Sequence, residues 1–162
     1  MGSERIDVSS APAHDRFARS SHRMPRSLES KIQAANSALM INGDLGAIGE
    51  CFTPDYAAHP TNQDPTGGHA AVRRVLCLYR RTFPDLTVAV EILVKGKDRV
   101  AWRRSLRAIH KGNFRGFPAT GRRIVWRDMV TSRFRDGLIA EDWLLTDLAE
   151  RLLLAHNTRS RA

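Results

Sequence analysis

The residues around Asp147 are the part of the sequence best suited to chemistry. The stretch EDWLLTD, residues 141–147, is expected to lie at the end of a β-strand. Because strand side chains alternate between two faces, one side carries Glu141, Trp143, Leu145 and Asp147. A carboxylate beside aromatic and apolar side chains has a raised pKa, so it can take up a proton and return it. The pattern predicts Asp147 as an acid/base group, with Trp143 in the wall of its pocket.

Asp147 also has a purely structural interpretation. The sequence Asp147-Leu-Ala-Glu150 has the spacing of a capping box at the start of a following helix. On spacing alone this helix cap is the favoured role. The two roles are compatible, since a side chain that starts a helix can still face a pocket.

Three further polar residues are candidate helpers of this carboxylate. His110 ends an expected strand on the face of Trp102, where it could donate to a substrate carbonyl or orient Asp147. A hydrogen bond at the strand end is the favoured alternative for His110. His59 and Asn62 lie in a loop dense in turn residues, so they could contact substrate or only the local backbone. No histidine pair has metal-ligand spacing with a carboxylate, so no metal site is expected.

The three tryptophans and one more carboxylate complete the candidate pocket. Trp102, Trp126 and Trp143 could line a pocket for a flat polycyclic ligand, although aromatic residues on strands are more often plain core. Asp128 shares a strand face with Trp126 and is a candidate second pocket carboxylate. Two carboxylates would favour epoxide opening, in which an acid and a water-activating base act together.

Arg104 interrupts the apolar face of the strand expected over residues 99–110. Charged side chains are rarely buried unless they are paired. We therefore expect an ion pair with a carboxylate such as Asp128 or Glu141, in preference to contact with an anionic ligand group.

Four consecutive strands and several helices are expected to position these residues. Alternating apolar residues predict strands over residues 86–94, 99–110, 122–135 and 138–145. Asp136-Gly137 is a strong signal for a two-residue hairpin turn between the last two strands. Helices are expected after Ser27 and Asp44, over residues 69–82, and after Asp147. Helices on one face of a curved antiparallel sheet make an α+β fold whose open cone is a natural small-molecule pocket.

Length and composition favour one globular domain. With 162 residues and 42% hydrophobic residues, the chain is expected to form one domain over residues 27–156, after a disordered or loosely attached tail over residues 1–26. No apolar run is long enough for a membrane span, and no signal peptide opens the chain. Cys51 and Cys77 lack metal spacing, so we expect reduced thiols and a cytoplasmic protein.

The net charge of +9 comes mostly from arginines spread over the whole sequence. A nucleic-acid-binding protein usually concentrates such charge on one helix or stripe. A solvated basic surface is therefore the favoured interpretation, and we expect neither a nucleic acid nor a membrane as partner.

Several stretches together resemble the SnoaL-like polyketide cyclases, a family of the cone-shaped nuclear transport factor 2-like superfamily. They are Phe83-Pro-Asp-Leu86, Asp98-Arg-Val-Ala101, the loop HKGNFRGFPATGR at residues 110–122, and RDGLIAEDWLLTD at residues 135–147. They occur in the family's order, and the resemblance covers about residues 30–155. It is specific for the fold and the family and says nothing of the substrate.

The resemblance implies a cofactor-free enzyme that closes a ring in a hydrophobic polyketide-type substrate by intramolecular aldol chemistry. An aspartate in or just after the last strand acts as acid/base in such cyclases, and Asp147 is the position that matches it. The resemblance also implies a homodimer or homotetramer. Two alternatives remain, because fold does not fix function: an epoxide hydrolase or epoxide-opening enzyme of the same fold, and a small-molecule-binding domain without catalysis.

Overall fold

A computed structural model of the chain describes residues 27–61 and 63–157. The tail predicted over residues 1–26 and the candidate residue Asn62 lie outside the described residues. Within the described part, no helix is both long and apolar enough to cross a membrane. Cys51 and Cys77 are free thiols.

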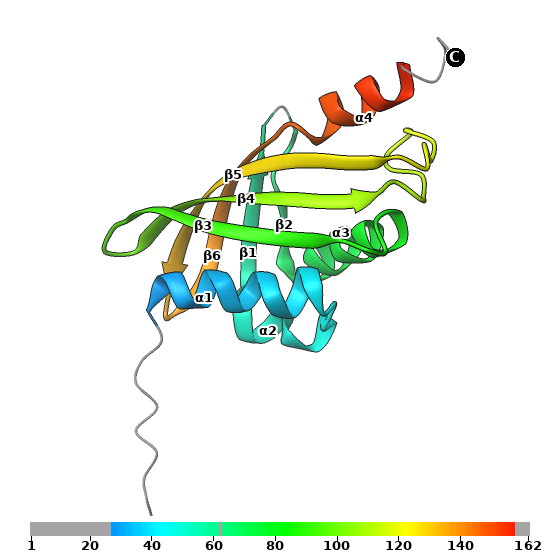
Figure 1. Cartoon of the computed structure of the whole chain (residues 1–162). Coiled ribbons are helices and arrows are strands. Elements are labelled where there is room, and N and C mark those ends of the chain that lie inside the picture. The colour runs from blue at the N-terminus through cyan, green and yellow to red at the C-terminus, as the bar shows by residue number, and fades with distance from the viewer. Residues whose placement is uncertain (1–26, 62, 158–162) are drawn as a thin grey trace, which may run out of the picture.

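The fold combines one curved sheet with helices (Figure 1). The helical segments are α1 (Leu28–Ala35), the π-helix η1 (Asn36–Ile41), the 3₁₀-helix η2 (Leu45–Ala47), α2 (Ile48–Cys51), α3 (Gly68–Thr82) and α4 (Leu148–Asn157). The strands are β1 (Phe52–Pro60), β2 (Thr66–Gly67), β3 (Thr87–Lys95), β4 (Arg99–Ile109), β5 (Arg123–Arg135) and β6 (Leu138–Thr146). Their order across the sheet is β2-β1-β6-β5-β4-β3. The predicted α+β class and the four consecutive antiparallel strands are confirmed.

The sheet differs from the prediction at one edge. Residues 56–59 were expected as a short connecting segment, but Phe52–Pro60 forms strand β1 and pairs in parallel with β6. The loop expected after residue 59 contains the short strand β2, which pairs antiparallel with β1. The sheet is therefore mixed, curved and unclosed, because β2 and β3 form its two edges.

The hairpin between β5 and β6 contains a β-bulge that determines which side chains of β6 face the interior. Its turn is the predicted Asp136-Gly137, and both residues have positive φ, 52° and 76°. Phe134 pairs with Ile139, whereas the next pair is Arg133 with Glu141, so Ala140 is the extra residue. A one-residue slip turns every following side chain to the opposite face of the sheet.

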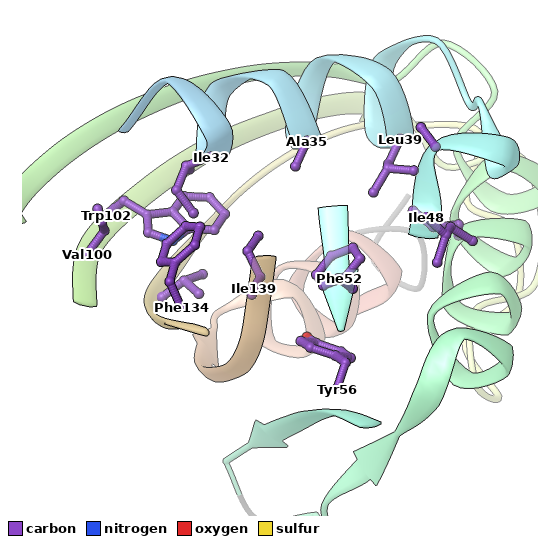
Figure 2. Packing of buried hydrophobic residues seen from close by; sticks show 13 residues of the cluster. Ile32, Ala35, Leu39, Ile48, Phe52, Tyr56, Val100, Trp102, Phe134 and Ile139 are labelled. Carbon is purple, nitrogen blue, oxygen red and sulfur yellow. The ribbon is translucent and has the colours of Figure 1, made fainter. Parts of the chain in front are cut away.

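The inner face of the sheet packs against α1 and α3, and alternate residues of β5 from Ile124 to Phe134 are buried. One apolar cluster joins Ile32 of α1 to Trp102 and Phe134 of the sheet, as Figure 2 shows. A second cluster contains Phe83, Trp126 and the α4 residues Leu148 and Leu152. α4 therefore covers the inner face near the start of β5.

Between the two apolar clusters lies a pair of charged residues. Along β4, Arg104 follows Trp102 of the first cluster and precedes Leu106 of the second. Along β5, Asp128 follows Trp126 and lies directly opposite Arg104. The apolar interior is thus interrupted by polar groups at the centre of the sheet.

Candidate active site

Arg104 forms the expected ion pair, and of the two expected partners the structure shows Asp128. Arg104 Nε donates to Asp128 Oδ2 at 2.7 Å, and its NH1 group donates to Asn36 Oδ1 at 3.0 Å. The Asp128 side chain is fully buried and that of Arg104 is 15% exposed. The guanidinium also lies 5.6 Å from the centre of the Trp102 ring. These contacts compensate for the loss of hydration that Arg104 and Asp128 undergo on burial.

Asn36, which belongs to the same hydrogen-bond network, lies where the α-helix α1 ends and the π-helix η1 begins. α1 begins with Ser27, whose side chain accepts a hydrogen bond from the Ser30 N–H, and continues into the π-helix η1 from Asn36. The Asn36 side chain is buried, and its amide donates to Ile32 O at 3.0 Å. π-Helical turns inside helices occur frequently at functional sites. Asn36 was not among the predicted site residues, although it has helical spacing to the apolar residues Ile32 and Leu39.

Asp142 is a second carboxylate on the inner face, and sequence analysis did not identify it. Tyr56 Oη donates to Asp142 Oδ2 at 2.9 Å, and the Ser132 hydroxyl donates to Oδ1. Trp102 Nε1 in turn donates to Ser132 Oγ at 2.9 Å. Asp142 is therefore connected through neutral donors to Trp102, one of the predicted site residues.

Asp142 has the electrostatics expected of an acid/base group. Burial raises its pKa above the ordinary value, although hydrogen bonds from Ser132 and Tyr56 and the charge of Arg104 oppose the shift. The residue is only partly buried, as are Ala58 and Leu144 beside it on the same face. A carboxyl group with a raised pKa in an incompletely buried residue can exchange a proton with a bound molecule.

Asp147 lies elsewhere, and the expectation that it faces the pocket is wrong. Its Oδ1 accepts from the Arg127 N–H at 2.7 Å, and its Oδ2 accepts from Arg151 Nε at 3.0 Å. Alternation puts Asp142 and Asp147 on opposite faces, and the bulge at Ala140 makes the face of Asp142 the inner one. Asp147 thus joins the start of α4 to β5. Within the described residues, Glu150, the expected capping partner, forms no hydrogen bond with Asp147.

Trp143 and His59 also lie on the outer face of the sheet, which corrects their expected place in the pocket. Their rings stack at 5.1 Å between centres, and His59 Nε2 lies 3.3 Å from Glu141 Oε2. Arg99 lies 5.2 Å from the Trp143 ring centre. Glu141 is further paired with Arg133, so it is not available to the interior.

His110 and Trp126 lie inside the protein. His110 is fully buried, with Nδ1 3.3 Å from Thr120 Oγ1, and its backbone N–H donates to Arg122 O. Burial lowers the pKa of His110, which favours the neutral ring. The Trp126 ring lies 4.8 Å from that of Phe83. The structure thus brings Trp102, Trp126 and Asp128 to one face with Asp142, and His110 to the end of β4.

Residues 27–61 and 63–157 contain no group of three or more His, Cys, Asp or Glu side chains placed to hold a metal ion. A cavity of about 100 Å³ lies between η1, α3 and the start of β3, lined mainly by Leu39, Leu76, Tyr79, Phe83 and Leu86. The side chains that line it are apolar apart from those of Tyr79 and Arg80.

Comparison with known proteins identifies one family, and several solved structures have a similar fold. The family model described as SnoaL-like polyketide cyclase matches residues 30–153. No curated protein matches the chain. The structure is similar to IdmH, a proposed polyketide cyclase from Streptomyces antibioticus, with 30% identity, a TM-score of 0.68 and coverage of 82% of this chain and 99% of the other.

Two further solved structures are similar over most of their length. AclR, a proposed hydroxylase from Streptomyces galilaeus, has 26% identity and a TM-score of 0.67, with coverage of 81% of this chain and 83% of the other. A SnoaL-like polyketide cyclase from Agrobacterium tumefaciens has 25% identity and a TM-score of 0.66, with coverage of 79% and 98%. On its family match over residues 30–153, the α+β cone and the order of its motifs, this chain belongs to the SnoaL-like polyketide cyclase family.

Proposed function

We propose that this protein is a cofactor-independent cyclase that closes a ring in a hydrophobic polyketide-type substrate by intramolecular aldol chemistry. Asp142 acts as the acid/base. The observation that carries this proposal is the position of Asp142 on the inner face, with a raised pKa, incomplete burial of the residue and the Tyr56 hydroxyl 2.9 Å away.

The proposed reaction uses Asp142 twice. Its ionised form removes a proton from a carbon between two carbonyl groups, and the resulting enolate carbon attacks a second carbonyl carbon of the same molecule. The alkoxide formed at that carbon then takes the proton back from Asp142. A raised pKa suits both steps, because the proton is neither held too weakly nor too strongly near neutral pH.

Tyr56 is the proposed donor to the developing oxygen charge. Its side chain is buried to 7% exposure, and its hydroxyl donates to Asp142. Once Asp142 has taken the substrate proton, the single hydroxyl hydrogen of Tyr56 can turn from the neutral carboxyl group to the enolate oxygen. A hydroxyl held in a largely water-free site stabilises an enolate oxygen more strongly than water does. Burial, together with the nearby Asp142, raises the pKa of Tyr56, so the hydroxyl keeps its proton and serves as a donor.

Epoxide opening is a second candidate, and one observation favours it. The interior contains two carboxylates in different surroundings, Asp128 ion-paired with Arg104 and Asp142 bonded to neutral hydroxyls. In that reaction Asp142 would protonate the epoxide oxygen while Asp128 would take a proton from the attacking water. Asp142 pairs with Ser132, four residues from Asp128 on β5, so the two Cα atoms lie roughly 13 Å apart along the sheet. This wide separation counts against joint action of the two carboxylates on one epoxide.

The deciding experiment measures turnover of a panel of linear polyketide-type keto-esters and aldehydes together with a matched panel of epoxides. Wild type is compared with Asp142→Asn and with Asp147→Asn, a control carboxylate on the other face of the sheet. Loss of a general acid/base group typically costs about 10²- to 10⁴-fold in rate. We expect that loss in ring closure for Asp142→Asn, with an unchanged melting temperature, and near wild-type rates for Asp147→Asn.

Other outcomes separate the alternatives. Loss of ring closure in Asp147→Asn but not in Asp142→Asn would overturn the assignment of Asp142. Epoxide turnover that requires both Asp142 and Asp128 would establish the second candidate. Ligand binding by all variants without turnover by any of them would favour a binding domain without catalysis.

A further inference from the structure

A chain of hydrogen bonds crosses the inner face of the sheet through four neighbouring strands. From β4, Trp102 Nε1 donates to Ser132 Oγ of β5 at 2.9 Å. The Ser132 hydroxyl donates in turn to Asp142 Oδ1 at 2.5 Å, and these two residues are directly opposite each other on β5 and β6. From β1, Tyr56 Oη donates to the other oxygen, Asp142 Oδ2, at 2.9 Å. Each carboxylate oxygen of Asp142 thus has its own neutral donor.

The hydroxyl hydrogen of Ser132 has one direction available to it. An indole N–H can only donate, so Trp102 occupies a lone pair of Ser132 Oγ and cannot accept its hydrogen. Ser132 is 0% exposed, and within the part of the chain that the structure describes its hydroxyl donates to Asp142 Oδ1 alone. Turning the hydrogen elsewhere would leave a buried donor unpaired, which is costly. The hydrogen therefore points to Oδ1 whether the carboxyl group is ionised or neutral.

This fixed direction decides which oxygen of Asp142 can carry a proton. A proton on Oδ1 would meet the hydrogen of Ser132, with nowhere for that hydrogen to turn. Oδ2 faces Tyr56, whose hydroxyl hydrogen can rotate away and leave its oxygen as an acceptor. The neutral carboxyl group thus has its O–H at Oδ2 and its C=O at Oδ1.

The same chain stabilises the ionised form of Asp142. Burial raises the pKa of Asp142, and the hydrogen bonds from Ser132 and Tyr56 and the charge of Arg104 oppose the shift. The Arg104 guanidinium lies 5.6 Å from the centre of the Trp102 ring, at the far end of the chain. Hydrogen bonds in series polarise one another in a low-dielectric interior, so Trp102 makes Ser132 a stronger donor.

We propose that Ser132 and Trp102 are positioning residues that make Oδ2 the proton-transferring oxygen of Asp142. Ser132 holds Oδ1 as an acceptor throughout, and Trp102 holds Ser132 in that orientation. This inference rests on the proposed function, in which Asp142 takes up a proton and returns it. It adds the atom: as the substrate C–H bond breaks, the O–H bond forms at Oδ2 beside the Tyr56 hydroxyl, and the same proton later passes from Oδ2 to the alkoxide.

The first test locates the proton by infrared spectroscopy of the full-length protein labelled with ¹³C at its aspartate carboxyl groups. The C=O stretch of neutral Asp142 is the band that Asp142→Asn lacks. Ser132→Ala should move this band to higher frequency, because the C=O oxygen Oδ1 loses its donor. Tyr56→Phe should leave the band near its wild-type position, because Tyr56 contacts the O–H oxygen. The opposite result, a shift in Tyr56→Phe alone, would place the proton on Oδ1 and overturn the proposal.

The second test follows the ionisation of Asp142 in the same labelled protein by ¹³C NMR titration. A hydrogen bond to a charged group corresponds to about 10- to 100-fold in an equilibrium constant. Ser132→Ala should lower the acid dissociation constant of Asp142 by that factor, and Trp102→Phe should lower it less. Ser132→Thr keeps the hydroxyl and should restore the wild-type value. Ser105→Ala, at an exposed position of β4, is the matched control and should leave it unchanged.

If Ser132→Ala does not fold, Ser132→Cys serves in its place, because a thiol is a weak donor and should give shifts in the same directions. An unchanged dissociation constant in both Ser132→Ala and Trp102→Phe would reduce the chain to a structural contact. Neither test uses a substrate. Absence of turnover would therefore overturn the proposed reaction without moving the proton, and a proton on Oδ1 would overturn this inference while ring closure persists.

Discussion

The two interior carboxylates differ in what surrounds them, and that difference determines what each can do. Asp128 is ion-paired with Arg104 and fully buried. Asp142 accepts hydrogen bonds from two neutral hydroxyls, and its pKa is raised by burial. Pairs of titratable groups with such contrasting environments are a typical basis for assigning acid and base roles. The carboxylate first expected to act, Asp147, instead fixes the start of α4 to β5.

His110 makes stability depend on pH. Its pKa is lowered by burial from an ordinary value of 6.5, so the folded protein favours the neutral ring. The unfolded chain then binds more protons than the fold as the pH falls. This contribution to stability is complete above about pH 6.5 and is lost as the pH falls toward the lowered value.

The corresponding prediction uses the denaturant midpoint at pH 7.5 and pH 5.0. Wild type should lose stability between these values, and His110→Phe should lose less. His156→Gln, at an exposed position of α4, is the matched control and should behave as wild type. An equal loss in wild type and His110→Phe would mean that other groups cause the pH dependence.

At the level of elements, the β5–β6 hairpin determines which residues enter the interior. Its turn needs positive φ at both Asp136 and Gly137, the backbone of a type I′ turn. Lys31 Nζ donates to Gly137 O at 2.5 Å, which ties α1 to this turn. A Cβ atom at Gly137 would lie 2.6 Å from Lys31 Nζ.

Gly137→Ala is therefore expected to destabilise the fold by about 1–2 kcal/mol, since a side chain in left-handed backbone adds strain. The control is Gly96→Ala in the neighbouring β3–β4 turn, where the added Cβ would lie at an ordinary 3.5 Å from the nearest atom. Chemical denaturation measures both. A Gly137→Ala variant as stable as Gly96→Ala would contradict this account of the turn.

On the scale of the whole molecule, the interior consists of two apolar clusters with a group of polar residues between them. α1 closes the first cluster and α4 the second, while Arg104, Asp128 and Asn36 lie between them. The outer face exposes Val125, Met129 and Leu145, with Met129 directly opposite Leu145. The predicted homodimer or homotetramer stays a prediction.

Removal of residues 2–26 tests the predicted domain boundary. Ser27 caps α1, and the family match begins at residue 30. We expect the shortened protein to keep the melting temperature and the turnover of the full chain. A clear fall in melting temperature would mean that this segment contributes to the folded domain.

The last four strands with the helix that follows them, the Asp136-Gly137 turn, an ion pair for Arg104 and the family could be predicted from the sequence. These depend on local patterns: alternation in strands, caps of helices and a turn that needs positive φ. The parallel pairing of β1 with β6 could not be predicted, because it joins segments about 85 residues apart through backbone bonds that leave no local pattern.

The candidate site shows the same division most clearly. Sequence alternation correctly placed Asp147 with Trp143 on one face and Asp128 with Trp126 on one face. Which of the two faces of β6 points inward depends on one extra residue, Ala140, and its only local signal is two consecutive buried residues, Ile139-Ala140. Alternation has a period of two, so a single bulge exchanges the faces beyond it. The sequence by itself determined the fold and the chemistry available to it, and the tertiary structure decided that Asp142, not Asp147, shares the interior with Trp102 and Asp128.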